Sequence, residues 1–399
     1  MSQTAATRVD SIGDPDHHGN DDGEKKPKSR RPANTAFRQQ RLKAWQPILT
    51  PKSVLPLFLV IGAIFAPLGG VLIWANSQVQ EIVIDYTHCA TEAPTGVPTS
   101  IPDGSVTSTF KSTSSGQVTW NRTATDNTTM TTNCSLYFNI PNSIGPPVFL
   151  YYRLTNFYQN HRKYVQSLDT DQLKGVAVDN GTIKGSTCDP LTIDGETGKA
   201  YYPCGLIANS LFNDSISSPV QVGKAGGEEI VYNMTDKGIA WSSDKELIKT
   251  SKYQPWEVMP PPNWRRKYPN YTEDNFPNLQ EDEAFMVWMR TAGLPTFSKL
   301  SLRNDDQAMP DGQYRLTIED SFNVTEYGGT KSIIISTRTV MGGKNSFMGI
   351  AYVVVGGVCV LLGVMFAIAH LVKPRKLGDH TYLTWNNEPA PAGVATGRE

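Results

Sequence analysis

Two long apolar stretches dominate the hydrophobic pattern of this chain. They read VLPLFLVIGAIFAPLGGVLIWA (54–75) and FMGIAYVVVGGVCVLLGVMFAIAHLV (347–372). No Asp, Glu, Lys or Arg occurs from Ser53 to Gln80 or from Asn345 to Val372. Each stretch exceeds the ~20 apolar residues that a helix needs to cross a bilayer. We predict transmembrane helices at 53–75 and 347–372 rather than buried helices of a soluble protein, because two such lengths occur.

The segment between the spans shows the period of two that is typical of β-strands. The alternating runs are EIVIDY (81–86), CSLYFNI (134–140), PVFLYYRL (147–154), EEIVYNM (228–234), QYRLTIEDSF (313–322) and TKSIIISTRTV (330–340). Pro- and Gly-rich loops separate them, and no regular βαβ rhythm appears. We therefore predict an α+β membrane protein in which two transmembrane helices flank a β-rich, antiparallel sandwich-like domain with long loops.

The stretch NFYQNHRKYVQS (156–167) has the period of an amphipathic helix instead. The predicted apolar face holds Phe157, His161, Tyr164, Val165 and the following Leu168, and the predicted polar face holds Gln159, Arg162, Lys163 and Gln166. This pattern favours a helix that packs on a sheet with its basic side outward. It favours a packed or hydrogen-bonded role for His161 over a catalytic one.

Charges at the ends of the spans predict the orientation. Nine Lys or Arg and no acidic residue lie between Lys25 and Lys52, and Lys373, Arg375 and Lys376 follow the second span. By the positive-inside rule both termini are cytosolic, and residues 76–346 form a lumenal or extracellular domain. Because roughly 50 hydrophilic residues precede it, the first span is an uncleaved anchor. We expect 1–33 to be a disordered tail, 34–52 a juxtamembrane segment and 373–399 a cytosolic tail.

Glycosylation sequons agree with this placement, because all eight N-x-[ST] patterns lie between the spans. Asn133 is the weakest candidate, since it precedes a cysteine. The other candidate sites are Asn121, Asn127, Asn180, Asn213, Asn233, Asn270 and Asn323.

Four of the five cysteines lie in the same loop, an even number that suits disulfides in an oxidising compartment. Sequential pairing, Cys89–Cys134 and Cys188–Cys204, is one of three possible connectivities. A zinc site is disfavoured, because no C-x-x-C or nearby His pair accompanies them. Cys359 falls within the second span, where we expect it to be a small packing residue.

Small residues follow one face of each span. Gly62, Ala66 and Gly70 are spaced by four residues, and Gly349, Gly356 and Gly363 by seven. In lipid, small residues allow close approach of two helices, so these faces predict helix–helix contacts.

Motifs for chemistry are scarce. Only His88 and His161 lie between the spans, and the sequence has no G-x-S-x-G, H-E-x-x-H, P-loop or D-K-T-G-T pattern. We predict no catalytic residue and no metal site. The net charge of −1 gives no reason to expect nucleic acid. The scarcity of chemical motifs is typical of a membrane protein that acts by binding. The alternatives are a two-span ligand-gated channel subunit and a membrane-anchored lumenal enzyme.

Several blocks resemble one family, the cell-division-control-protein-fifty or ligand-effect-modulator family, whose members are accessory β-subunits of type IV P-type ATPases, the lipid flippases. The blocks are NTAFRQQRLKAWQPILTP, IDYTHC, FLYYRLTNFYQNHRKYVQS, PCGLIANSLFND, GIAWSSDK, FMVWMRTAGLPTFSKL and GGKNSFMGIAYVVVGG, between residues 34 and 357.

The resemblance implies a non-enzymatic partner and chaperone of a ten-span catalytic α-subunit that moves phospholipids from the exoplasmic to the cytosolic leaflet. It implies a heterodimer in the endoplasmic reticulum, Golgi, endosome or plasma membrane, with no cofactor of its own, because ATP and Mg²⁺ belong to the pump. It also implies the sequential disulfides and contacts of the N-terminal segment under the pump. The residues of that segment are Phe37, Arg38, Arg41 and Trp45.

Two further hypotheses combine the resemblance with the residue pattern. The small-residue faces of the spans would be the pump-docking surfaces. Arg162 and Lys163 would contact acidic exoplasmic loops of the pump.

Overall fold

The protein is described by a computed structural model that covers residues 34–42, 50–112, 116–123, 131–223, 229–337 and 343–374. Residues 55–374 form one compact unit that contains both long helices and the domain between them. Residues 34–42 belong to the other unit and are considered by themselves.

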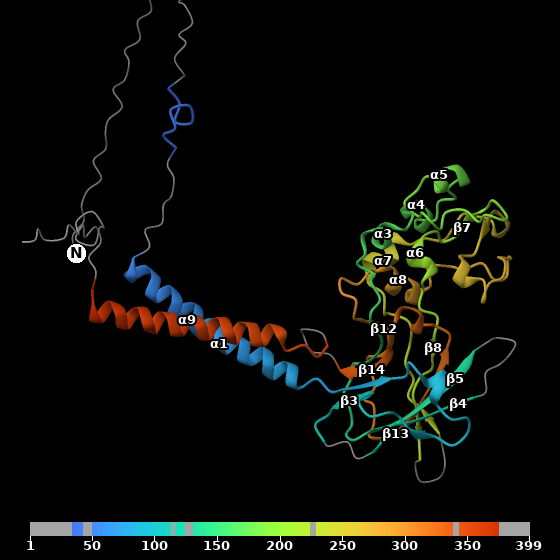
Figure 1. Ribbon diagram of the computed structural model, residues 1–399, viewed down its shortest axis with the longest axis horizontal. Coiled ribbons are helices and arrows are strands. Elements are labelled where there is room, and N and C mark those ends of the chain that lie inside the picture. Colours follow the sequence, from blue (N-terminus) through green and yellow to red (C-terminus); the bar gives the residue numbers. More distant parts are fainter. Residues whose placement is uncertain are drawn as a thin grey trace, which may run out of the picture. The chain divides into compact units, whose positions relative to one another are not determined.

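The two apolar stretches form helices α1 (Pro51–Ser77) and α9 (Phe347–Val372). Helix α1 begins two residues before its predicted start, because Pro51 occupies the first helical turn, where its missing N–H is not needed. Only 11% of the most apolar window of either helix is buried. This exposed apolar surface, together with the length of both helices, is that of a two-span membrane protein. Figure 1 shows α1 and α9 lying along each other.

Two antiparallel sheets contain twelve of the fourteen strands in the described part of the domain between the spans. The first has the order β12-β6-β14-β1-β3, and the second has the order β10-β9-β13-β5-β4-β2, with β8 paired to β13. The bounds are β1 (Glu81–Asp85), β2 (Thr99–Ser100), β3 (Val106–Thr109), β4 (Thr119–Arg122), β5 (Thr132–Ile140), β6 (Val148–Leu154), β8 (Ser215–Ile216), β9 (Val220–Val222), β10 (Ile230–Val231), β12 (Phe297–Asn304), β13 (Gly312–Asp320) and β14 (Lys331–Thr337).

The main core lies between these sheets, as the sandwich prediction requires. Along β5, Leu136 and Phe138 are buried while Ser135 and Tyr137 are only partly covered. They join Ile333 and Ile335 of β14 in one cluster. Burial of each such side chain stabilises the fold by about 1.5–3 kcal/mol. The antiparallel β-rich fold class is confirmed.

Short helices form a lobe beyond the sheets (Figure 1). Its elements are α3 (Arg162–Gln166), α4 (Thr170–Leu173), α5 (Asn180–Lys184), α6 (Leu206–Asn209), α7 (Ser242–Leu247), α8 (Glu283–Met289), η1 (Pro255–Glu257), η2 (Pro262–Trp264) and the parallel pair β7 (Ala200–Tyr201) and β11 (Val258–Met259). Helix α2 (Cys89–Glu92) precedes the lobe elements in the chain, and the 3-10 helix η3 (Thr325–Tyr327) follows them. An aromatic cluster joins the lobe to the first sheet, since Trp288 of α8 packs with Tyr152 of β6 and Phe297 of β12.

The helix predicted across 156–167 is reduced to the five residues of α3. Asn156 adopts a positive φ of 56° and donates from Nδ2 to the carbonyl of Tyr327, and His161 is still extended. These two conformations prevent a helix from starting earlier.

The predicted faces of this stretch are partly wrong for the same reason. Phe157, Tyr164 and Leu168 do pack in the aromatic cluster. Val165 and His161 are exposed instead. Gln159, predicted to face outward, is fully buried and accepts a hydrogen bond of 2.9 Å from the amide of Ala292.

Candidate functional site

The small-residue faces of the spans contact each other. A Cβ atom added at Gly356 of α9 would lie 2.7 Å from the backbone nitrogen of Ala66 in α1, and one at Gly349 would lie 2.7 Å from Ile73. On α1 the close approach uses Gly62 and Gly69, and a Cβ atom at Gly69 would lie only 2.8 Å from the carbonyl oxygen of Gly349. The two helices therefore pack through glycines spaced by seven residues on both sides.

This arrangement corrects the predicted faces. Gly70 lies away from the contact, with no atom within 4 Å of the place where its Cβ would stand, and Gly69 takes its place. Gly62, Ala66, Gly349, Gly356 and Gly363 are covered by the other span of the same chain. These faces hold the two spans together, so a docking surface for a further helix would lie elsewhere on them.

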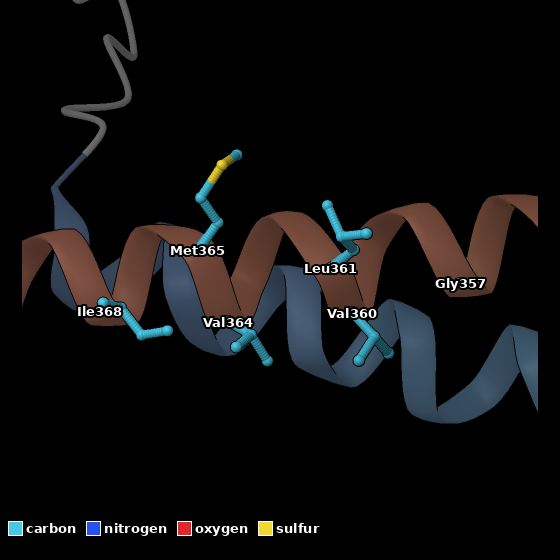
Figure 2. A pocket seen from close by; sticks show the side chains of 6 residues that line it. All are labelled: Gly357, Val360, Leu361, Val364, Met365 and Ile368. Carbon is cyan, nitrogen blue, oxygen red and sulfur yellow. The ribbon is translucent and has the colours of Figure 1, made fainter.

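The outward side of α9 offers such a surface. Gly357, the neighbour of the buried Gly356, has no atom within 4 Å of the place where a Cβ would stand. It lines a shallow apolar groove together with Leu361, Val364, Met365 and Ile368, all drawn in Figure 2. Leu361 and Met365 point away from α1 in Figure 2, whereas Val360, which also lines the groove, lies against Gly62 of α1. A further transmembrane helix can approach α9 closely at Gly357.

The N-terminal segment is described only at 34–42, and Trp45 lies outside the described residues. Residues 36–40 of the predicted juxtamembrane segment form a turn. The Arg41 guanidinium donates to Asn34 Oδ1, while Phe37 is 76% exposed. Phe37, Arg38 and Arg41 thus present an exposed aromatic ring and two cations, a composition suited to a partner or a membrane surface.

In the lobe, α3 presents Arg162 and Lys163 to solvent. No ion pair involves either side chain within the part of the chain that the structure describes. Tyr164 of the same helix holds it in place, because its hydroxyl lies 2.8 Å from Ser210 Oγ of the segment after α6.

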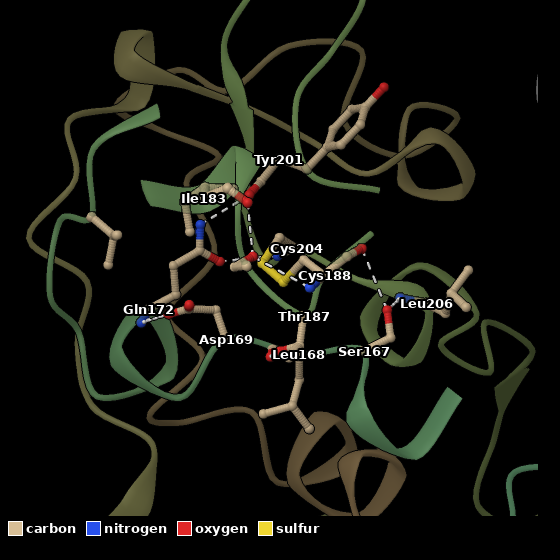
Figure 3. Close-up of a disulfide and its surroundings, with 12 residues drawn as sticks. Ser167, Leu168, Asp169, Gln172, Ile183, Thr187, Cys188, Tyr201, Cys204 and Leu206 are labelled. Atoms are coloured by element: carbon tan, nitrogen blue, oxygen red, sulfur yellow. Dashed lines mark hydrogen bonds between the residues drawn. A yellow bond between two sulfur atoms is a disulfide. The ribbon is translucent and has the colours of Figure 1, made fainter. Parts of the chain in front are cut away.

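Two disulfides hold the domain, and they are the sequential pairs Cys89–Cys134 and Cys188–Cys204. The first joins α2 to β5 inside the main core. The second lies in the lobe, where Figure 3 shows the buried Gln172 and Ser167 beside it. Gln172 Oε1 accepts from the amide of Cys204 at 3.0 Å, and Gln172 Nε2 donates to the carbonyl of Tyr201.

A buried charge cluster ties the two sheets. Lys331 of β14 is 2% exposed, and its Nζ donates to Asp214 at 2.8 Å, Asp320 at 2.5 Å and the carbonyl of Phe322. Tyr86 donates to Asp214 at 2.9 Å. Burial raises the pKa of the Asp320 carboxyl, and Lys331 opposes this shift. The sequence pattern did not reveal this cluster, since Asp320 and Lys331 lie within alternating runs as ordinary polar residues.

The sequons differ in how their amides are used. Asn213, Asn233 and Asn270 are exposed, and no side-chain hydrogen bond of theirs is seen among the described residues. The Nδ2 atoms of Asn121, Asn180 and Asn323 donate to Gly96, Gly198 and Glu326 respectively. Asn127 lies outside the described residues.

Among the described residues there is no group of three His, Cys, Asp or Glu that could hold a metal ion.

Comparison with known proteins gives a consistent result. The model of the LEM3 (ligand-effect modulator 3) family / CDC50 family matches residues 72–376. A phospholipid-transporting ATPase accessory subunit CDC50 of Chaetomium thermophilum is 43% identical over 94% of this chain and 96% of its own length. The accessory subunit CRF1 of Saccharomyces cerevisiae is 43% identical over 91% of both chains. Cell cycle control protein 50A of Mus musculus is 39% identical over 86% of this chain and 89% of its own length.

Proposed function

Because the chain belongs to the LEM3/CDC50 family, we propose that it is the accessory subunit of a phospholipid-transporting P-type ATPase. The observation that carries this is the end-to-end match to named accessory subunits, 94% of this chain at 43% identity. The match includes both spans, through which a membrane pump would be contacted. The relatives give no support to a channel subunit.

In this role the chain is a chaperone and a non-catalytic partner. It escorts the catalytic subunit out of the endoplasmic reticulum and stabilises it while phospholipids move from the exoplasmic to the cytosolic leaflet. ATP and Mg²⁺ belong to the catalytic subunit, since this sequence has neither a P-loop nor a phosphorylation loop. Both termini are cytosolic, as the basic flanks indicate. Asn213, Asn233 and Asn270 are the preferred candidates for lumenal glycosylation, because they are exposed and no side-chain hydrogen bond of theirs is seen among the described residues.

Two surfaces support docking on the pump. The groove at Gly357 takes a membrane helix of the pump, because close backbone approach is possible there. Arg162 and Lys163 of α3 contact acidic exoplasmic loops, since both cations are solvent-exposed.

Co-purification tests the proposal. The full-length chain, tagged, is expressed with a phospholipid-transporting ATPase of its own organism and isolated in detergent. We expect a stable complex whose ATPase activity is stimulated by phospholipid and falls when this chain is omitted. A chain that recovers no such ATPase, or that gives ionic currents when expressed alone, would contradict the proposed function.

Charge reversal tests the α3 surface within the same assay. The double variant Arg162→Glu and Lys163→Glu should lower recovery of the pump, because like charges would face its acidic loops. Reversal of Lys184 in α5 serves as a control at another exposed lysine of the lobe. Undiminished recovery and activity of the double variant would remove α3 from the interface.

A further inference from the structure

The lobe contains a pocket that none of the surfaces above uses. It has a volume of about 440 Å³ and lies between α4, α7 and α8. This volume falls in the range of about 300–1,000 Å³ that is usual for small-molecule sites. None of its lining residues is a cysteine or belongs to the spans.

Its walls are apolar. Leu173 of α4, Ile248 after α7, and Met286 and Met289 of α8 line it. All four also belong to the lobe's hydrophobic clusters, so the walls are anchored in packed structure. Methionine side chains adapt to irregular apolar ligands. Leu247 lines the same pocket but is 58% exposed, which leaves apolar surface for an occupant to cover.

The rim is charged and held in place. Arg290 donates to both carboxylate oxygens of Asp244, at 2.8 and 3.0 Å from Nη2, and its guanidinium lies 3.6 Å from the ring centre of Trp241. These contacts use Nε and Nη2, and no bond from Nη1 is seen in the described parts of the chain. Lys174 on the rim is only 3.4 Å from Asp171.

Lys299 fixes the end of α8 that carries Arg290. Its ammonium is buried and donates to the carbonyl oxygens of Val287, Trp288 and Arg290 at 3.0, 2.7 and 2.7 Å. A cation at the carboxyl end of a helix satisfies carbonyls that lack helical partners. The rim cation is therefore positioned before any ligand arrives.

We propose that this pocket binds a single-chain amphiphile with an anionic head. The alkyl chain fits the apolar walls, and the head lies at the rim. There Nη1 of Arg290 and the ammonium of Lys174, whose exposed pair with Asp171 spans 3.4 Å, can donate to it. Carboxylate and phosphate heads share this chemistry. The site does not depend on the proposed function, because no pump residue is needed to form it.

Photolabelling tests the site. The full-length chain is placed in phosphatidylcholine nanodiscs, and the probe is a lysophosphatidic acid with a diazirine in its acyl chain. After irradiation, mass spectrometry should locate adducts on the peptides that contain Leu173 and Met286–Met289. Unlabelled lysophosphatidic acid and palmitate should both compete, while inorganic phosphate should not. Competition by phosphate alone would overturn the amphiphile assignment.

Pairs of variants, each pairing a pocket position with an exposed control position, test the site further. Leu247→Trp fills the pocket and should reduce labelling about tenfold, while Leu294→Trp, at another exposed leucine, should not. Lys174→Glu should weaken labelling about tenfold through loss of a charged contact, while Lys184→Glu should not. Adducts confined to α1 and α9, or equal labelling in Leu247→Trp, would overturn the proposal. So would a photo-crosslinker at position 247 that captures a protein loop in place of lipid.

Discussion

At the scale of single residues, the domain relies on buried polar groups that connect segments far apart in sequence. Lys331 joins β14 to Asp214 and to Asp320 of β13, so that one ammonium bridges both sheets. Asp194 plays a similar part in the lobe, where Thr197, Tyr201 and Arg265 all donate to its carboxylate. Such groups stabilise only while every partner is present.

Replacement of Lys331 by Met should lower the free energy of unfolding by roughly 3 to 5 kcal/mol, because two buried carboxylates lose their cation. The difference in unfolding free energy between this variant and the unchanged protein should shrink as the pH falls. The pKa of Asp320 is already raised, so protonation of the folded state relieves the charge there first. Thermal unfolding of the full-length protein between about pH 4 and pH 7 would measure this, with Lys184→Met as the exposed control. A pH-independent deficit would contradict the account.

Replacement of Asp194 by Asn addresses acid stability. The hydroxyl of Thr197 and the guanidinium of Arg265 lower the pKa of Asp194, against the effect of burial. A lowered folded pKa contributes stability that is present above the ordinary Asp value and is lost as the pH falls through the folded pKa. We expect the Asn variant to lose roughly 2 kcal/mol at neutral pH and to show a smaller further loss in acid. Urea unfolding at about pH 7 and pH 3 would measure this. If the Asn variant lost as much unfolding free energy between these two pH values as the unchanged protein, the account would be wrong.

At the scale of elements, α1 and α9 show that adjacent glycines can have different roles. Gly356 lies against the backbone of Ala66, while Gly357 faces open space on the other side of the helix. The ring contact between Phe65 and Tyr352, with centroids 5.0 Å apart, lies along the same contact between the helices. Spacing along the sequence identified one glycine face on each span but not what covers it.

This difference provides a matched pair of variants. Gly356→Leu should separate the spans, because the new side chain would meet the backbone of α1. Gly357→Leu should leave the spans packed and reduce recovery of the pump about tenfold, by obstructing the outward groove. Cysteines placed at Phe65 and Tyr352, in a Cys359→Ala background, report span packing through their crosslinking yield. Full pump recovery with Gly357→Leu would exclude the groove from docking.

At the scale of the whole molecule, each disulfide stabilises a different part. Cys89 and Cys134 belong to the core between the sheets, and Cys188 and Cys204 belong to a separate cluster in the lobe. The bridges close segments with sequence separations of 45 and 16. In the chain-entropy model they stabilise by roughly 4 and 3 kcal/mol respectively.

Loss of each bridge should therefore have a different consequence. Cys188→Ala with Cys204→Ala should expose the lobe to limited proteolysis while the sandwich stays protected, because the main core does not include this bridge. Cys89→Ala with Cys134→Ala should expose both regions. Cleavage sites mapped by mass spectrometry distinguish the two results, and global cleavage in the lobe variant would contradict a separable lobe.

Strand prediction succeeded where alternation was uninterrupted. Five of the six runs named from the sequence lie on β1, β5, β6, β13 and β14, and the sixth shortens to Ile230–Val231 in its described part. Strand β12 was missed. Its residue Lys299 is buried against the carbonyls of α8, and an inward lysine breaks the hydrophobic period on which the prediction rests.

The sequence by itself determined the two spans, the antiparallel β-rich class, the family and the absence of recognisable catalytic motifs. These depend on local apolar continuity, on period-two alternation and on quoted motifs, all of which are readable along the chain. Only the tertiary structure decided what the glycine faces contact, which side of residues 156–167 is buried and where the lobe forms a pocket. Those features arise from contacts between segments more than a hundred residues apart, such as α1 with α9 or Gln159 with Ala292, and the local pattern contains no information about their partners.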